Sequence, residues 1–207
     1  MVQNNTYNFY IEEKTMTNII RNSEQSGRSM VEMLGVLAIV GVLSIGGISG
    51  YSKAMAKYKV NKTLDQVSML VTNIRSIFGN QTSYSGLNTK TVIDFEMMDK
   101  DMLNTASTLI NPYQGSIVIA NDGRKFSVQY LDLPKVACST IASSNWGDSA
   151  ASGLESISVG GQSAKGTAAT GTTYNWTDAT NKLPISFAAA GTSCSSDNYN
   201  TIKWVYY

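Results

Sequence analysis

An uninterrupted uncharged segment, residues 33–52, constrains this chain more than any other feature. Its 20 residues contain no charged residue, proline, asparagine or glutamine. As an α-helix the segment would be about 30 Å long, which matches the hydrocarbon core of a lipid bilayer. A helix that is apolar on every side is either buried in a protein core or spans a membrane. The length favours the membrane-spanning interpretation, and a buried core helix is the alternative.

The segment differs from the apolar part of an ordinary secretory signal peptide. Such a part is about 7–15 residues long and is followed by a cleavage site of the A-x-A kind. Here the apolar run is longer, and residues 49–55 continue it without a good cleavage site. We therefore expect the segment to remain attached to the residues that follow it.

After residue 51 the chain continues with a second helical pattern. Six apolar residues follow one another at alternating intervals of four and three positions, which places them on one face of a helix. The opposite face is polar, so this part of the helix can lie on another layer of structure. The sequence predicts one helix over 30–78 that ends at Gly79-Asn80 and is weakest at Gly46, Gly47 and Gly50. The apolar stripe consists of Val60, Leu64, Val67, Val71, Ile74 and Phe78, and the polar face includes Lys59, Lys62, Asp65, Gln66, Asn73 and Arg75.

The remaining residues, 80–207, have the mixed pattern of a small globular domain. The sequence predicts short helices over 91–98 and 99–109, before the break at Asn111-Pro112. A further short helix is predicted over 134–146, which contains Cys138.

Strand patterns occur in the same region. Two β-rich runs, 116–120 and 125–131, are joined by Asn-Asp-Gly-Arg, which predicts a hairpin. Residues 147–200, rich in Gly, Ser, Thr and Asn, predict strands and long loops, and 201–207 alternate as a last strand. The expected fold class is therefore α+β, with a long N-terminal helix packed on a small antiparallel sheet.

Composition excludes several classes of function. The chain has no histidine, which removes His-based catalytic triads and His-ligated metal sites. Two cysteines are too few for a Cys-only zinc or iron–sulfur site, and a net charge of +1 argues against a strongly basic nucleic-acid binder. We interpret Trp146, Trp176 and Trp204 as packing residues rather than as a sugar-binding platform. The sequence contains no catalytic constellation, so we expect neither an enzyme nor a cofactor or metal site.

A single carboxylate, Glu32, stands directly before the uncharged segment, and Gly27 stands five residues earlier. A charge at the edge of a bilayer-spanning helix is unfavourable by roughly a few kcal/mol unless another group neutralises it. One interpretation is an interfacial side chain that interacts with the positive end of the helix dipole. The other is a specific partner for the carboxylate.

Together, Gly27, Glu32, the apolar and then amphipathic helix, and the cysteine pair resemble the type IV pilin class. Pilins usually carry a hydrophobic residue or methionine directly after the leader, whereas Arg28 stands here. Three sequence segments, residues 78–87, 111–115 and 133–138, resemble the type IVb branch. That branch includes the thin-pilus pilins of conjugative plasmids.

The resemblance implies an organisation in three parts. Residues 1–27 would be a leader peptide, 28–79 the N-terminal helix with its assembly segment at 33–52, and 80–207 a globular head. Met16 is a second candidate start, which would shorten the leader.

The resemblance also implies roles for individual residues. A prepilin peptidase would cut between Gly27 and Arg28, and the freed amino group would pair with Glu32 of a neighbouring subunit, which neutralises two charges in apolar surroundings. Cys138 and Cys194 lie in the half expected to be exported, where oxidation to a disulfide is favoured, and two buried free thiols are the alternative. Their spacing is not the C-x-x-C of a redox-catalytic pair.

The expected function is therefore structural: a prepilin that polymerises through its N-terminal helix into an extracellular filament. The expected partners are further copies of the chain, the prepilin peptidase, the inner-membrane assembly machinery and, before assembly, the membrane itself. We expect the precursor in the bacterial inner membrane and the mature subunit in an extracellular pilus. Two alternatives remain open: a type II secretion pseudopilin or minor pilin, and an uncleaved, signal-anchored binding domain.

Overall fold

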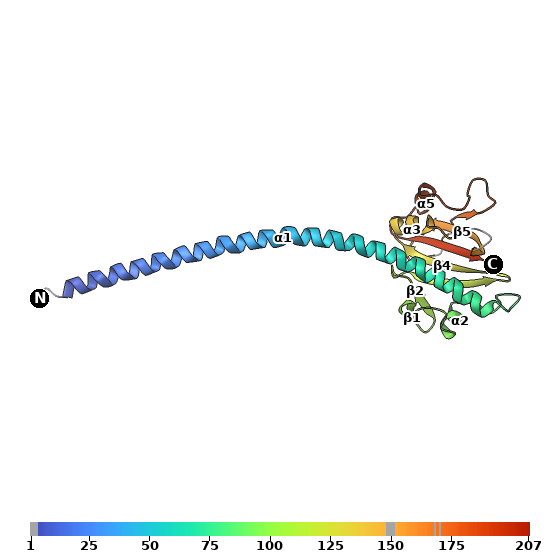
Figure 1. The fold of residues 1–207 in the computed structure, drawn as a ribbon, viewed down its shortest axis with the longest axis horizontal. Coiled ribbons are helices and arrows are strands. Elements are labelled where there is room, and N and C mark those ends of the chain that lie inside the picture. Colours follow the sequence, from blue (N-terminus) through green and yellow to red (C-terminus); the bar gives the residue numbers. More distant parts are fainter. Residues whose placement is uncertain (1–3, 148–151, 168, 170) are drawn as a thin grey trace. The chain divides into compact units, whose positions relative to one another are not determined.

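The computed structural model describes the backbone of residues 4–147, 152–167, 169 and 171–207, and side chains from Ser29 onward within these ranges. The chain divides into two compact units, Met1–Ala54 and Met55–Tyr207. The first unit is helical, and the second combines the end of the same helix with a sheet and shorter helices (Figure 1).

Helix α1 spans Asn4–Phe78. Its end at Phe78 is the one predicted, and the glycine-rich stretch around Gly46 and Gly47 stays helical. Its start lies well before the predicted Met30. The earlier residues lack an apolar stripe, but they contain no proline, and a helix once nucleated gains a hydrogen bond with each added residue.

The part of α1 after Met55 buries an apolar face in the second unit, as the stripe predicted. The face is wider than six positions, because Leu70 and Thr63 are fully buried as well. Gln66 was predicted to lie on the polar face, and that prediction is wrong: only 3% of its surface is exposed. Gln66 precedes Val67 and stands one turn before Leu70, so the buried face includes it. The stripe residues buried against the core are Val67, Val71, Ile74 and Phe78, and Val60 and Leu64 are partly buried beside them.

A seven-stranded antiparallel sheet forms the other layer of this unit, which confirms the α+β class. The strand order is β1-β2-β3-β4-β7-β5-β6, so the last strand of the chain lies in the interior beside β4 (Figure 1, β7 in red). The strands are β1 (Leu103–Thr105), β2 (Thr108–Ile110), β3 (Ser116–Asp122), β4 (Lys125–Leu133), β5 (Leu154–Gly161), β6 (Thr172–Asn175) and β7 (Asn200–Tyr206).

The predicted hairpin is confirmed as β3–β4. Asp122 pairs with Lys125, which leaves Gly123 and Arg124 as a two-residue turn. Gly123 has φ +62°, a backbone conformation that glycine adopts without the steric strain of a side chain.

The predicted helix over 99–109 is wrong. Only Lys100–Met102 form a 3₁₀ turn (η1), and β1 and β2 follow it. The pairing of Leu109 with Ile117 of β3 adds this segment to the sheet, and tertiary pairing of that kind overrides a weak local preference. The helix predicted over 91–98 is present as α2 (Thr89–Asp94), shifted toward the N-terminus because the Asn88 side chain caps it by accepting from the Thr91 amide.

Two short helices complete the unit. Helix α3 (Lys135–Ala142) lies within the predicted range 134–146 and contains Cys138. Helix α5 (Phe187–Ser193) was not predicted, although Ser186 caps it by accepting from the Ala189 amide. All three tryptophans contact the core as predicted: Trp204 is fully buried, and Trp146 and Trp176 are partly buried against it.

Candidate functional site

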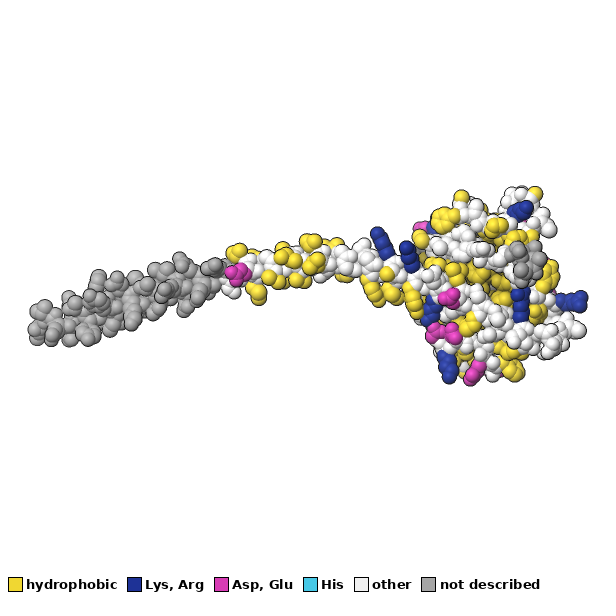
Figure 2. Space-filling model, in the orientation of Figure 1, with side chains coloured by type: hydrophobic (Ala, Val, Ile, Leu, Met, Phe, Trp, Pro, Cys, Tyr) yellow, Lys and Arg dark blue, Asp and Glu magenta, His cyan; other side chains and the backbone are white. Residues whose placement is uncertain are grey.

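The apolar stretch of α1 leaves its side chains exposed. Twelve large hydrophobic side chains between Met30 and Ile48 are each more than half exposed, and they follow one another along the helix (Figure 2). Among the described residues, one helical stretch, Ser29–Phe78, is long and apolar enough to cross a membrane by length and composition. The first unit therefore presents an apolar surface that nothing within the described part of that unit covers.

Polar groups within this stretch are directed back to the helix itself. The Ser44 hydroxyl donates to the Val40 carbonyl at 2.7 Å, and the Ser52 hydroxyl donates to the Ile48 carbonyl at 2.9 Å. Such bonds satisfy a hydroxyl without water, which suits a helix surrounded by lipid or by other helices.

Glu32 lies in α1 with its side chain exposed, immediately before the apolar stretch. Gly27 and Arg28 belong to α1 by their backbone, and their side chains lie outside the described residues. The predicted cleavage position and the predicted assembly carboxylate are thus on one helix, while the two cysteines are in the second unit.

Cys138 and Cys194 are joined in a disulfide, and both are fully buried. Cys138 lies within α3, and Cys194 is the C-terminal cap residue of α5. The bond therefore ties the two short helices together and closes a loop that contains β5 and β6. No free cysteine is present in the chain.

Arg75, in the last turn of α1, attaches this helix to the end of the sheet. Its guanidinium donates to the Ser152 carbonyl at 2.7 Å and to the Tyr207 carbonyl at 3.2 Å, and it lies 5.1 Å from the centre of the Tyr206 ring. Burial raises the pKa of Tyr206 to about 12, and the charge of Arg75 opposes that increase. The sequence placed Arg75 on the polar face; a basic residue in the last turn of a helix was the available signal for this anchor.

Two lysines about four turns earlier on α1 contact the segments that precede the hairpin. The ammonium of Lys62 forms an ion pair with Asp101, and the hydrogen bond to Asp101 raises the pKa of Lys62. The ammonium of Lys59 lies 5.5 Å from the centre of the Tyr113 ring. Both contacts hold the 99–113 region against the helix.

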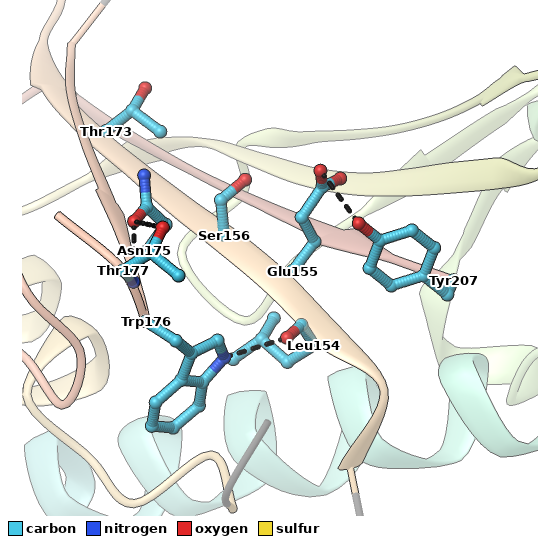
Figure 3. A pocket seen from close by; sticks show the side chains of 8 residues that line it. All are labelled: Leu154, Glu155, Ser156, Thr173, Asn175, Trp176, Thr177 and Tyr207. Atoms are coloured by element: carbon cyan, nitrogen blue, oxygen red, sulfur yellow. Dashed lines mark hydrogen bonds between the residues drawn. The ribbon is translucent and has the colours of Figure 1, made fainter. Parts of the chain in front are cut away.

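A cavity of about 500 Å³ lies at the edge of the sheet, where β5, β6 and Tyr207 meet (Figure 3). Trp176 lines this cavity, and its indole Nε1 donates to the Leu154 carbonyl at 2.9 Å. The Tyr207 hydroxyl donates to Glu155 Oε1 at 3.2 Å, and Lys125 donates to the same oxygen at 2.5 Å. These intramolecular bonds engage the principal polar groups of the cavity. We therefore interpret the cavity as a structural feature of the sheet edge.

Known proteins resemble this chain along most of its length. Residues 57–207 match the family described as PilS N terminal. A major structural subunit of bundle-forming pilus from Escherichia coli O127:H6 (strain E2348/69, EPEC) is 29% identical over 188 residues, which cover 81% of this chain and 97% of that protein. The protein of the same description from Escherichia coli O111:H- is 29% identical over 141 residues, or 65% of this chain and 72% of that protein. Since the family match covers well over half of its length, the chain belongs to the PilS N-terminal family, and the type IVb pilin resemblance of its sequence is confirmed.

Proposed function

We propose that this chain is the structural subunit of a type IVb pilus, made as a prepilin and polymerised through its N-terminal helix into an extracellular filament. One observation carries the proposal: an exposed apolar helix is joined to a head that matches the PilS N-terminal family. The relatives named as major structural subunits of a bundle-forming pilus support the same function.

The physical argument concerns where the apolar surface is covered. Burying one Val, Leu or Ile side chain stabilises by about 1.5–3 kcal/mol, so a row of such side chains is strongly unfavourable in water. The bilayer covers that surface in the precursor, and the helices of neighbouring copies cover it in the filament. A subunit of this kind is positioned and polymerised by other proteins, and it catalyses no reaction itself.

The role of Glu32 follows from the same environment. In a bundle of apolar helices its carboxylate requires a positive partner, because an isolated buried charge is strongly destabilising. Cleavage after Gly27 creates such a partner, the amino group of Arg28, on every copy. The leader peptide, residues 1–27, thus keeps the subunit in its precursor form until a prepilin peptidase removes it in the inner membrane.

The mass of the subunit in sheared filaments tests this proposal. We expect a mature chain of 180 residues beginning at Arg28, and abundant recovery of it from the cell surface, which distinguishes a main subunit from a pseudopilin or minor pilin. Gly27→Leu should accumulate as a full-length membrane precursor without filaments, and Glu32→Ala should be cleaved but assemble poorly. Filaments that retain residues 1–27, or normal filaments built from Glu32→Ala subunits alone, would refute it.

A further inference from the structure

A second cavity, separate from the sheet edge, lies beside α1 within the Met55–Tyr207 unit. Its volume is about 470 Å³. One wall is formed by α1, and the other is formed by Asp99 and the turn η1 that follows it. The lining residues are Tyr58, Asn61, Lys62, Asp65, Gln66, Met69, Asp99 and Asp101.

The charges of this cavity do not balance. Three carboxylates and one ammonium give a net charge of −2. Asp101 is paired with Lys62, whereas Asp65 and Asp99 make no ion pair within the described part of the chain. Gln66 is 3% exposed and its Oε1 has no hydrogen-bond partner there. The unmet groups are therefore all acceptors, so the cavity fits a positively charged donor.

That donor is an organic cation rather than a metal ion. No group of three acidic, Cys or His side chains among the described residues could hold a metal. A single ammonium, in contrast, can bridge one or two carboxylates without a closed ligand shell.

A suitable ammonium occurs on α1 of the same chain. Between residues 33 and 64 the charged residues are lysines alone, at positions 53, 57, 59 and 62. Lys59 lies over Tyr113 and Lys62 is paired with Asp101, but Lys57 is exposed and forms no ion pair within the described residues. A helix rises 1.5 Å per residue, so Lys57 and Asp65 of one copy are attached about 12 Å apart along the axis.

A second copy removes this separation. If two α1 helices lie parallel and one is displaced by about 12 Å along the axis, Lys57 of one copy comes level with Asp65 of the other. The donor and the acceptor are different surfaces of the subunit, so the contact is head-to-tail and repeats along a filament without closing.

We propose that this cavity receives the Lys57 ammonium of an adjacent copy and is an electrostatic contact between heads in the filament. The inference rests on the proposed function, since it requires parallel α1 helices packed side by side. It assigns Asp65 and Asp99 as the partners of Lys57, beyond the pairing of Glu32 with the amino terminus. The contact also fixes the axial displacement between the two copies.

Cysteine pairs placed on different copies test the contact directly. One copy carries Lys57→Cys, a second carries Asp99→Cys, and the two are expressed together and oxidised as filaments. Asp99 makes no capping bond to η1, so its replacement removes a charge without breaking a described contact. We expect a disulfide-linked dimer that requires both copies, and none when Lys165→Cys, an exposed lysine outside the cavity, replaces Lys57→Cys.

Charge reversal supplies a second measurement. Lys57→Glu and Asp99→Lys should each lower the yield of sheared filaments roughly tenfold, and the two changes in one chain should restore it. Lys165→Glu makes the same charge change elsewhere and should have little effect. Filaments that form normally from both cysteine copies but give no dimer would overturn the inference, as would a double reversal no better than the single ones. An absence of filaments from the unmodified chain would instead refute the proposed function.

Discussion

Removing the disulfide should destabilise the head by about 4 kcal/mol or more. Cys138 and Cys194 are separated by 56 positions, and the loss of chain entropy on closing a loop of this length corresponds to about 4 kcal/mol at 25 °C. Both residues are fully buried, so Cys138→Ala/Cys194→Ala also leaves space where the sulfur atoms were, at about 1 kcal/mol for each. Domains are stable by only about 5–15 kcal/mol, so this is a large fraction of the total.

Urea unfolding of the full chain in mild detergent measures this loss. The fluorescence of Trp204, which is buried and lies 4.9 Å from the Trp146 ring, reports on the core of the head. With a denaturant slope of at most about 3 kcal/mol per molar, a loss of 4 kcal/mol lowers the midpoint by at least roughly 1.3 M.

The reduced, unmodified chain is the matched control, because it loses the cross-link and keeps both sulfur atoms. We expect its midpoint to lie between those of the oxidised chain and the double variant. Equal midpoints for the oxidised chain and the double variant would refute the reasoning, since they would mean that the loop of β5 and β6 is restricted in the unfolded state without the bond.

Two further predictions concern Arg75, at the end of α1, and Tyr206, the ring that it contacts. Arg75→Lys keeps the charge but cannot reach both carbonyl oxygens in the same way, so the head should lose about 1.5–3 kcal/mol of stability in the same urea assay. Tyr206 keeps its proton in the folded head up to a pKa of about 12, whereas the unfolded chain releases it near pH 10. The unfolded state therefore binds fewer protons between these values, and stability should fall by at most about 1.4 kcal/mol per pH unit as pH rises from 10 to 12. Tyr206→Phe should remove that part of the pH dependence, and an unchanged slope would contradict the assignment.

Sequence patterns predicted the elements that carry strong local signals. The stripe of α1 was visible because its spacing follows the helix period, and its buried members lie where the pattern placed them. The β3–β4 hairpin was visible because Asn121-Asp-Gly-Arg demands a tight turn between two β-rich runs. The uncharged segment, which is long enough to cross a membrane, needs no tertiary information, since its length and lack of charge define it.

Other features depend on contacts that no local pattern encodes. Leu109 becomes part of a strand because Ile117 lies beside it, not because of its sequence neighbours. Gln66 is buried because the second unit covers a wider face of α1 than the apolar residues mark. The cavity beside α1 combines Asp65 with Asp99, which are distant in sequence. The helical pattern placed Asp65 on the polar face, and no local pattern related it to Asp99.

This chain has two kinds of apolar surface, one buried inside the head and one exposed along the helix. The difference explains why the head folds within a single chain and assembly follows as a separate step. The head buries its own core, from Leu70 of α1 to Trp204 of β7, and does so within one chain. The twelve exposed side chains between Met30 and Ile48 cannot be buried that way, because a single helix has no interior. At about 1.5–3 kcal/mol for each, their burial is worth roughly 20–35 kcal/mol, more than the stability of a whole domain. That free energy is available only in a bilayer or against other copies. Under the proposed function, the subunit therefore passes from the membrane into the filament in one continuous transfer. The head contacts, including the one proposed for Lys57, then act on subunits already held together by their helices. They set the axial displacement of the copies and add to the stability of the filament.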